Sequence, residues 1–319
     1  MPFLSALAAR LARGLEVAAQ RLRGGGGEAT PPPAAPEAPP STHPAMRFAP
    51  PGHFYSPIPD LDELARQAPR VFGGTRDLPG IDLREREQLE LLERFRPFYA
   101  DQPFTATKTP GRRYWFENPQ YSYSDALCYH FMLRWLRPER VIEVGSGFSS
   151  CVALDTADSH LGGKLELTCI EPYPERLEEL LQEGDRARIE LLRNPVQDVP
   201  LEVFSRLQPK DILFIDSTHV VKVGGDVNHL YFEVLPRLRP GVHVHIHDVF
   251  FPFEYPRSWF DEGRVWSEAY LLHAFLLHNR DFEITLFNTF LEDRHPDLFR
   301  QHFPLTLKNL GGSIWLRRK

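Results

Sequence analysis

Two short stretches of the chain carry side chains that could move a proton or hold a metal ion. The first ends in Asp216-Ser-Thr-His219, and the second ends in His247-Asp248 after two further histidines. A histidine such as His219 or His247 has a pKa suited to taking a proton from a hydroxyl group near neutral pH. Alternatively, Asp216 and Asp248 could hold a hard divalent ion that orients an acceptor and lowers its pKa.

Three histidines stand at alternate positions before Asp248. Side chains alternate along a strand, so His243, His245 and His247 share one face. A His-x-His pair such as His245 and His247 could bind a softer ion such as Zn2+. A central strand is buried against helices, however, and we interpret His243 and His245 as packed side chains. Because charged ligands are few, we favour a histidine base over a metal ion.

A glycine turn, Glu143-Val-Gly145-Ser-Gly147, follows an apolar run and opens a predicted helix. Glycine lets the backbone bend sharply and approach a ligand, and the free N–H groups of the helix face the same space. The turn therefore predicts a nucleotide-like cofactor. Ser150 stands where a dinucleotide fingerprint requires a third glycine. Glu171 ends the next apolar strand and could accept hydrogen bonds from both hydroxyls of a ribose, which favours an adenosine ligand.

Strands and helices alternate along the rest of the chain and must position these groups. Such alternation predicts an α/β fold with a parallel sheet, whose ligands bind at the carboxyl ends of the strands. The predicted strands span residues 140–144, 165–170, 189–192, 211–215, 242–246, 282–287 and 312–316. The predicted helices span residues 61–67, 83–100, 125–136, 149–158, 174–182, 201–207, 225–235 and 267–278.

The E-x-G-x-G pattern, the acid that closes the second strand, and the runs Asp-Ser-Thr-His and His-Asp-Val-Phe-Phe-Pro-Phe-Glu-Tyr-Pro resemble a known family. They are similar to class I S-adenosylmethionine-dependent methyltransferases, in particular the bacterial domains of methyltransferase family 24. The resemblance covers about Phe54 to Arg317. It implies a Rossmann-like sheet of strand order 3-2-1-4-5-7-6 with an antiparallel last strand, and S-adenosylmethionine as cofactor.

The resemblance also assigns site residues. The implied cofactor contacts are Glu143, Gly145, Gly147 and Ser149 at the methionine part, Glu171 at the ribose, Val196 and Gln197 at the adenine, and Asp216. The implied catalytic groups are Asp216, His219, His247 and Asp248. Catechol O-methyltransferase-like relatives place metal-binding acids at the ends of strands four and five. Val249 stands where a further ligand would follow Asp248, which argues against a metal at Asp216 and Asp248.

Aromatic and acidic residues before the glycine turn and after the fifth strand are candidates for binding the acceptor. They are Tyr114, Tyr123, Glu254, Tyr255 and Trp266. Pockets are largely apolar with a few polar groups, and loops often carry binding residues. The same residues could instead pack a cap onto its domain or form a surface connection stiffened by proline.

The chain divides into three predicted regions. Residues 1–45 hold an amphipathic, arginine-rich helix at 2–23 and a glycine- and proline-rich linker, which we expect to be flexible. Residues 46–124 are predicted as an N-terminal helical and aromatic cap or lid, and residues 125–319 as the cofactor-binding domain. The helix at 2–23 could contact a membrane surface or a partner protein, or it could be a frayed tail or dock on its own domain.

The composition of the chain indicates which binding partners and which cellular compartment to expect. The net charge of −6 gives no sign of a nucleic-acid binder, which would carry a basic surface. The three cysteines are scattered in apolar sequence, which predicts neither a disulfide framework nor a thiolate metal site. We therefore expect a cytoplasmic protein, with membrane association through residues 2–23 left open.

The expected function is S-adenosylmethionine-dependent O-methylation, an EC 2.1.1 type of reaction, on a small-molecule or glycan hydroxyl. Methyl transfer is an in-line displacement, so the enzyme must position the acceptor and make it nucleophilic with a histidine base or a divalent metal. An NAD-dependent oxidoreductase or epimerase is one alternative, against which Ser150 counts. A non-catalytic cofactor-binding protein is another. The sequence does not indicate the oligomeric state.

Overall fold

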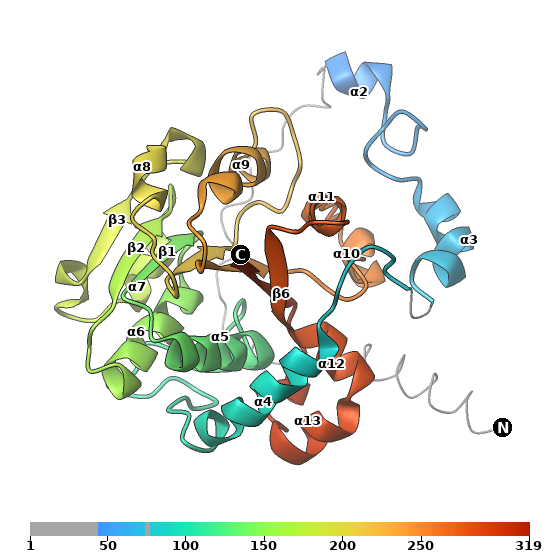
Figure 1. Cartoon of the computed structure of the whole chain (residues 1–319). Coiled ribbons are helices and arrows are strands. Elements are labelled where there is room, and N and C mark those ends of the chain that lie inside the picture. Colours follow the sequence, from blue (N-terminus) through green and yellow to red (C-terminus); the bar gives the residue numbers. More distant parts are fainter. Residues whose placement is uncertain (1–43, 74–76) are drawn as a thin grey trace. The chain divides into compact units, whose positions relative to one another are not determined.

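The computed structural model describes residues 44–73 and 77–319 (Figure 1). The chain divides between Leu64 and Ala65, so residues 44–64 belong to one unit and Ala65–Lys319 to another. The amphipathic helix expected at residues 2–23 and its linker lie outside the described residues. The cap at 46–124 and the domain at 125–319 stay a prediction.

The first unit holds the short helix α2 (Pro44–Phe48) and the start of α3 (Leu61–Val71). Asp60 precedes α3, and its carboxylate accepts a hydrogen bond from the backbone N–H of Glu63, which satisfies a donor of the first turn. The rings of Phe48 and Tyr55 stack with their centroids 6.0 Å apart.

A seven-stranded sheet forms the centre of the second unit, in the order β3-β2-β1-β4-β5-β7-β6. The order is the predicted one, and β7 is antiparallel to both of its neighbours, as expected. The strands are β1 (Arg140–Val144), β2 (Glu166–Ile170), β3 (Ile189–Leu192), β4 (Ile212–Ile215), β5 (His243–His247), β6 (Phe282–Phe287) and β7 (Ser313–Arg318).

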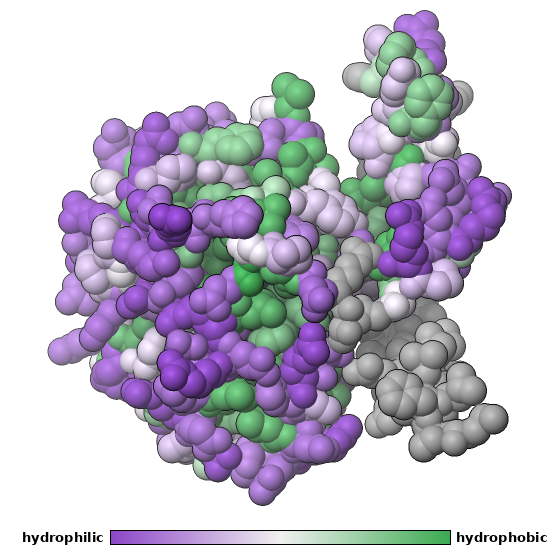
Figure 2. Space-filling view, turned by 45° about the vertical axis from the view of Figure 1, so that its right-hand side comes forward, coloured by the Kyte–Doolittle hydropathy of each residue, from purple (hydrophilic) through white to green (hydrophobic). Residues whose placement is uncertain are grey.

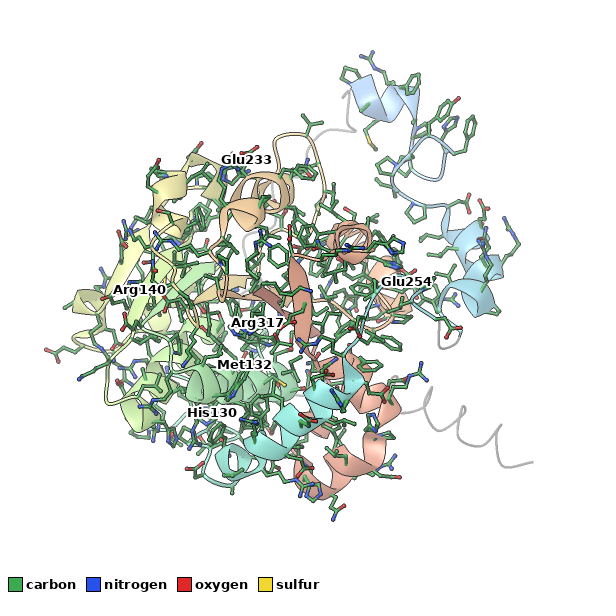
Figure 3. All side chains as sticks on the ribbon, in the orientation of Figure 1. His130, Met132, Arg140, Glu233, Glu254 and Arg317 are labelled. Carbon is green, nitrogen blue, oxygen red and sulfur yellow. The ribbon has the colours of Figure 1, made fainter. Side chains whose placement is uncertain are left out.

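Helices cover both faces of this sheet. Figure 1 shows α4, α5 and α6 on one side and α8, α9 and α11 on the other. The remaining helix bounds are α4 (Glu85–Ala100), α5 (Tyr123–Leu136), α6 (Phe148–His160), α7 (Glu175–Leu180), α8 (Leu201–Phe204), α9 (Asp226–His229), α10 (Arg257–Asp261), α11 (Glu268–Leu276), α12 (Asn288–Arg294) and α13 (Pro296–His302). His130 and Met132, labelled on α5 in Figure 3, are both fully buried. Helices α10, α12 and α13 were not predicted from the sequence.

An aromatic cluster fills the core between α5 and strands β4, β5 and β7. Phe214, His245 and Trp315 are direct neighbours across the three strands. The ring centroids of His245 lie 4.1 Å from Phe214 and 4.7 Å from Trp315, and Tyr129 of α5 covers them. Burial keeps the pKa of His245 well below its usual range and lowers that of His243 to about 4. These two histidines are therefore neutral packed side chains, as we interpreted them.

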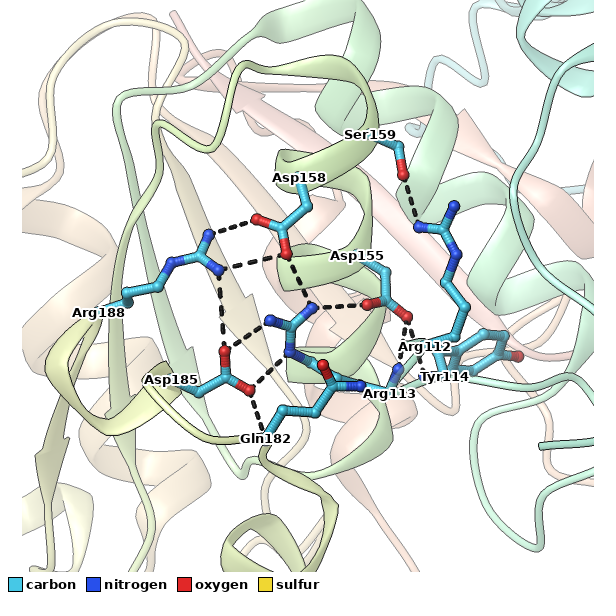
Figure 4. Close-up of polar contacts among 9 residues, drawn as sticks. All are labelled: Arg112, Arg113, Tyr114, Asp155, Asp158, Ser159, Gln182, Asp185 and Arg188. Carbon is cyan, nitrogen blue, oxygen red and sulfur yellow. Dashed lines mark hydrogen bonds and ion pairs between the residues drawn. The ribbon is translucent and has the colours of Figure 1, made fainter. Parts of the chain in front are cut away.

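A buried ion network anchors the aromatic segment before α5 (Figure 4). The guanidinium of Arg113 donates two hydrogen bonds of 2.6 Å to the carboxylate of Asp185, and a third of 2.7 Å to Asp155 of α6. The backbone N–H groups of Arg113 and Tyr114 donate to the other oxygen of Asp155. Such bidentate pairs fix geometry as well as contribute energy. Arg113 thus joins α6, the turn before β3 and the segment that carries Tyr114.

The described surface is mainly polar. The face drawn in Figure 2 is mostly hydrophilic, with apolar residues showing near its middle. Large apolar side chains that remain exposed include Tyr173, Val223 and Phe232. None of the helices in residues 44–73 and 77–319 is long and apolar enough to cross a membrane. All three cysteines are free and buried, and burial raises their pKa values above the usual value.

Candidate functional site at the strand ends

The glycine turn after β1 lies directly against the residue that follows β4. Gly145 has a φ of 82°, and a Cβ atom built on it would lie 1.9 Å from the carbonyl oxygen of Asp216. The backbone N–H of Asp216 in turn donates to the carbonyl of Val144 at 2.8 Å. Only glycine fits this conformation and this approach. The close contact therefore places the predicted cofactor turn beside the first of the predicted catalytic acids.

Glu143 is a fully buried carboxyl group beneath the glycine turn. Its Oε2 accepts a hydrogen bond from the hydroxyl of Ser150, which itself accepts one from the backbone N–H of Gly147 at 3.1 Å. Its Oε1 has no hydrogen-bond partner among the described residues. Burial raises the pKa of Glu143 to about 8. An unpaired oxygen of this kind can accept a hydrogen bond from a donor group of a bound ligand.

Glu171 follows β2 and is held by the backbone on both sides. Its Oε2 accepts the N–H of Ser146 in the glycine turn at 3.2 Å, and its Oε1 accepts the N–H of Tyr173 at 2.8 Å. Each carboxylate oxygen has a second lone pair, so both can still accept a ligand hydroxyl. Glu171 thus lies at the edge of the glycine turn, and its role at the ribose stays a prediction.

The other three predicted cofactor residues lie on α6 and in the segment after β3. Ser149 is buried in the first turn of α6. Val196 and Gln197 form a short 3-10 helix after β3, where Val196 is buried. The side-chain amide of Gln197 donates to the carbonyl of Gly224 at 3.0 Å, which ties the loop after β3 to the loop after β4.

His219 lies among three carboxylates. Its Nδ1 is 2.8 Å from Oε2 of Glu268, and its Nε2 is 3.2 Å from Oδ1 of Asp216 and 3.8 Å from Oδ2 of Asp248. Burial alone would lower the pKa of His219, but its hydrogen bonds to Asp216 and Glu268 raise it well above the usual value. Both contacts favour the protonated form of the ring over the neutral form that a general base requires.

The backbone of His219 is fixed by the first turn of α11. Its φ is 58°, in the left-handed region that non-glycine residues rarely adopt. Its carbonyl accepts hydrogen bonds from the N–H groups of Ser267 and Glu268 at 2.9 and 3.1 Å, which caps α11. Trp266 covers the imidazole, with ring centroids 4.5 Å apart. The position of the ring is thus determined from three directions.

His247 and Asp248 end β5 on the other side of this cluster. His247 is buried, with its Nε2 3.6 Å from Oδ1 of Asp248 and its Nδ1 unpaired among the described residues. Burial would lower its pKa, but Asp248 and Asp216 raise it above the usual value. Asp248 has a φ of 54° and, like Asp216, keeps part of its side chain exposed. The exposed carboxylates mark the side from which an acceptor can approach.

The three tyrosines that were predicted to bind the acceptor are all held by hydrogen bonds within the protein. Tyr114 and Tyr255 are buried. The hydroxyl of Tyr114 donates to the carbonyl of Tyr121 at 2.7 Å, and the hydroxyl of Tyr255 accepts the N–H of Ala269 at 3.0 Å. Both therefore contribute to packing, the alternative that the sequence left open. The hydroxyl of Tyr123, at the start of α5, donates to the carboxylate of Glu117. Burial and this hydrogen bond raise the pKa of Tyr123 to about 12.

Trp266 is the predicted acceptor residue that contacts a catalytic candidate, since it lies on His219. Glu254 is in the loop between β5 and α10 (Figure 3), where Oε1 accepts hydrogen bonds from the hydroxyl of Tyr270 and from a backbone N–H. Glu268 was not assigned from the sequence, although it is fully buried and bonded to His219. The sequence feature that could have indicated Glu268 is its place as an acid in the first turn of a predicted helix, directly after the aromatic loop.

The predicted metal ligands Asp216 and Asp248 both lie near the ring of His219. Within residues 44–73 and 77–319, no group of three or more histidine, cysteine, aspartate or glutamate side chains is arranged to hold a metal ion. Nε2 of His219 lies 3.2 Å from Asp216 and 3.8 Å from Asp248. A divalent ion at Asp216 and Asp248 stays a prediction.

Comparison with known proteins identifies the family. A family model described as a methyltransferase domain, that of methyltransferase family 24, matches residues 142–249. An uncharacterized protein of Archaeoglobus fulgidus is 38% identical over 168 residues, which cover 51% of this chain and 75% of that protein. The chain belongs to the class I methyltransferases of family 24 type. The resemblance seen in the sequence is thereby confirmed, and with it S-adenosylmethionine as the cofactor of the family.

Solved methyltransferase structures are also similar to this methyltransferase. The SAH-bound enzyme of Podospora anserina has a TM-score of 0.43 and 14% identity, over 82% of this chain and 98% of that one. The O-methyltransferase TomG of Streptomyces achromogenes, in complex with SAM, has a TM-score of 0.41 and 18% identity, over 63% of this chain and 83% of that one.

Proposed function

We propose that this methyltransferase transfers a methyl group from S-adenosylmethionine to a hydroxyl of a small-molecule or glycan acceptor. The contact between Gly145 and Asp216 carries the proposal, because it joins the cofactor turn to the acids and histidines at the ends of β4 and β5. A methyl group bound over the glycine turn would then face Asp216 and Asp248, which are the partly exposed carboxylates of the cluster.

The chain offers a complementary group for each part of the cofactor. Oε1 of Glu143 is buried without a partner and suits the ammonium group, and Glu171 suits the ribose hydroxyls. Val196 and Gln197 would lie at the adenine, after β3. When bound, the cofactor supplies a methyl group on a sulfonium, a good leaving group, so the protein need only position the acceptor and remove its proton.

We assign proton removal to His247 together with Asp248. Both ring nitrogens of His219 are hydrogen-bonded to carboxylates, those of Glu268 and Asp216, so neither nitrogen is free to take a proton from an acceptor. The Nδ1 of His247 is buried, whereas its Nε2 lies 3.6 Å from Oδ1 of the partly exposed Asp248 and has no hydrogen bond to a carboxylate. The carboxylate of Asp248 can orient an acceptor hydroxyl while His247 takes the proton, and a positioned base of this kind contributes roughly 10²- to 10⁴-fold to a rate.

Two measurements test the proposal. Calorimetry with S-adenosylmethionine, S-adenosylhomocysteine and NAD should show binding of the first two and not of NAD; the reverse result would replace the proposal with a dehydrogenase. A screen of sugars and phenols for transfer of labelled methyl should then identify the acceptor class.

The base is tested with His247→Gln once an acceptor is known. The variant should lose roughly 10²- to 10⁴-fold in kcat with the affinity for S-adenosylmethionine retained. His302→Ala on α13 is the matched control, because His302 belongs to none of the strand ends. Full activity of His247→Gln would remove His247 from the mechanism.

A further inference from the structure

We propose that Arg176, in the first turn of α7, binds the carboxylate of the methionine part of S-adenosylmethionine. The proposal rests on the proposed methyltransferase function and deepens it, because the cofactor residues predicted from the sequence include no lysine, arginine or histidine. The methionine part of the cofactor carries a carboxylate as well as an ammonium group. A site that removes both charges from water needs a partner for each of them.

The side chain of Arg176 lies against the glycine turn. A Cβ atom built on Gly147 would lie 3.5 Å from Cδ of Arg176 and 4.0 Å from its Cγ. Apart from the two neighbours of Gly147 in the chain, no other described residue comes that close. The aliphatic part of Arg176 therefore occupies the space that a side chain at position 147 would fill. Its guanidinium group, which follows Cδ directly, is within reach of the turn.

The charge of Arg176 is available to a ligand. Within residues 44–73 and 77–319, its guanidinium makes no hydrogen bond or ion pair, and the side chain is exposed. Two other arginines near α7, Arg186 and Arg193, both pair with Glu178 of that helix. An arginine presents its N–H donors in a planar fork that matches the two oxygens of a carboxylate.

The backbone of the turn favours an anion as well. Gly147 directly precedes α6, which is 13 residues long and has no acidic residue in its first turn. The N–H groups at the start of a helix point away from it, and the helix dipole places partial positive charge there. Arg176 adds a full positive charge next to Gly147, so both features attract a negatively charged group to the same turn.

Glu143 supplies the complementary charge at this turn. Its Oε1 is buried and unpaired among the described residues, and it can accept a hydrogen bond from the ammonium group. The hydroxyl of Ser150 donates to Oε2 of Glu143 and accepts the N–H of Gly147 at 3.1 Å. One hydroxyl thus links the acid to the residue that Arg176 covers. An acid and an arginine at one turn match the two charges of an amino acid.

The experiment compares S-adenosylmethionine with its decarboxylated form by calorimetry. The decarboxylated form keeps the adenosine, the sulfonium and the ammonium group and lacks only the carboxylate. The wild-type chain should bind it more weakly than S-adenosylmethionine. Arg176→Met should weaken binding of S-adenosylmethionine by roughly 10- to 100-fold, the range for a lost hydrogen bond to a charged group. The same substitution should not weaken binding of the decarboxylated form.

Two further variants complete the design. Arg176→Lys should restore part of the affinity for S-adenosylmethionine, because lysine keeps the charge but not the planar fork. Arg94→Met, at an exposed position of α4, is the matched control and should bind both ligands as the wild-type chain does. Arg176 is exposed, so its variants should keep the fold, which urea unfolding checks.

The possible outcomes can be told apart. Unchanged affinity of Arg176→Met for S-adenosylmethionine would overturn the proposal. An equal loss for both ligands would overturn it too, because the arginine would then act on a part of the cofactor other than the carboxylate. A wild-type chain that binds neither ligand would refute the proposed function itself, and the role of Arg176 with it.

Discussion

Glutamine in place of Glu143 should remove one contribution to the pH dependence of stability in the cofactor-free protein. Glu143 is an acid whose pKa rises from 4.5 to about 8 on folding, because it is fully buried with one oxygen unpaired. The folded chain therefore binds a proton that the unfolded chain releases between these values. The stability is fully present below pH 4.5 and is lost as the pH rises through about 8.

The size of the effect follows from this shift. One pKa unit corresponds to about 1.4 kcal/mol, so the difference between 4.5 and about 8 amounts to about 5 kcal/mol once the pH is well above 8. Between pH 6 and pH 8 the free energy of unfolding should fall by about 2 kcal/mol through this group alone. Glu143→Gln keeps the shape of the side chain and an acceptor for Ser150, but it does not titrate.

The assay is urea unfolding of both proteins at several pH values from 6 to 8, without cofactor. The difference between the two free energies isolates Glu143, because the other buried acids and histidines titrate equally in both. Glu93→Gln, at an exposed position on α4, is the matched control for loss of one carboxylate. A difference that stays constant across this range would show that Glu143 is already ionised at pH 6 and would refute the reasoning.

Three further substitutions test the cofactor side and the fold. Glu171→Ala should weaken binding of S-adenosylmethionine by about 1.5–3 kcal/mol in calorimetry, as for a lost hydrogen bond to a charged group; unchanged affinity would remove Glu171 from the ribose site. Gly145→Ala should destabilise the chain by about 2–4 kcal/mol in chemical unfolding, because its Cβ would meet the carbonyl of Asp216 and its φ is positive, and a neutral result would contradict that contact. Arg113→Met should cost about 3–5 kcal/mol in the same assay, because it removes the guanidinium that pairs with the buried carboxylates of Asp155 and Asp185, and a stable variant would show that the network contributes little.

The strands of the sheet could be predicted from the sequence, because each strand is determined by residues that are close together in the chain. Each parallel strand is a short apolar run bounded by turn residues, and the order followed from the family resemblance. The nearness of Glu171 to the glycine turn has the same origin, since both stand at the ends of neighbouring strands, whereas their roles in binding the cofactor stay predictions. The packing of His243 and His245 also followed from the position of their strand.

The sequence could not predict which of His219 and His247 is hydrogen-bonded to carboxylates through both ring nitrogens. The answer depends on Glu268, which is 49 residues beyond His219 and reaches it only because α11 begins against the loop after β4. The interior positions of Tyr114 and Tyr255 were equally hidden, because an aromatic residue in a loop has the same pattern whether it lines a pocket or fills a core. Side chains that meet only through tertiary packing show no regular spacing in the sequence, so their contacts could not be predicted from it.

The burial of the three cysteines makes the chain convenient for site-specific labelling. A thiol reacts as the thiolate, and Cys128, Cys151 and Cys169 are buried with raised pKa values. Tyr173 is 78% exposed, and its backbone N–H is bonded to Glu171. A fluorophore attached to Tyr173→Cys would thus have little competition from the native thiols and would report from the edge of the glycine turn, so ligand binding could be followed before any acceptor is known.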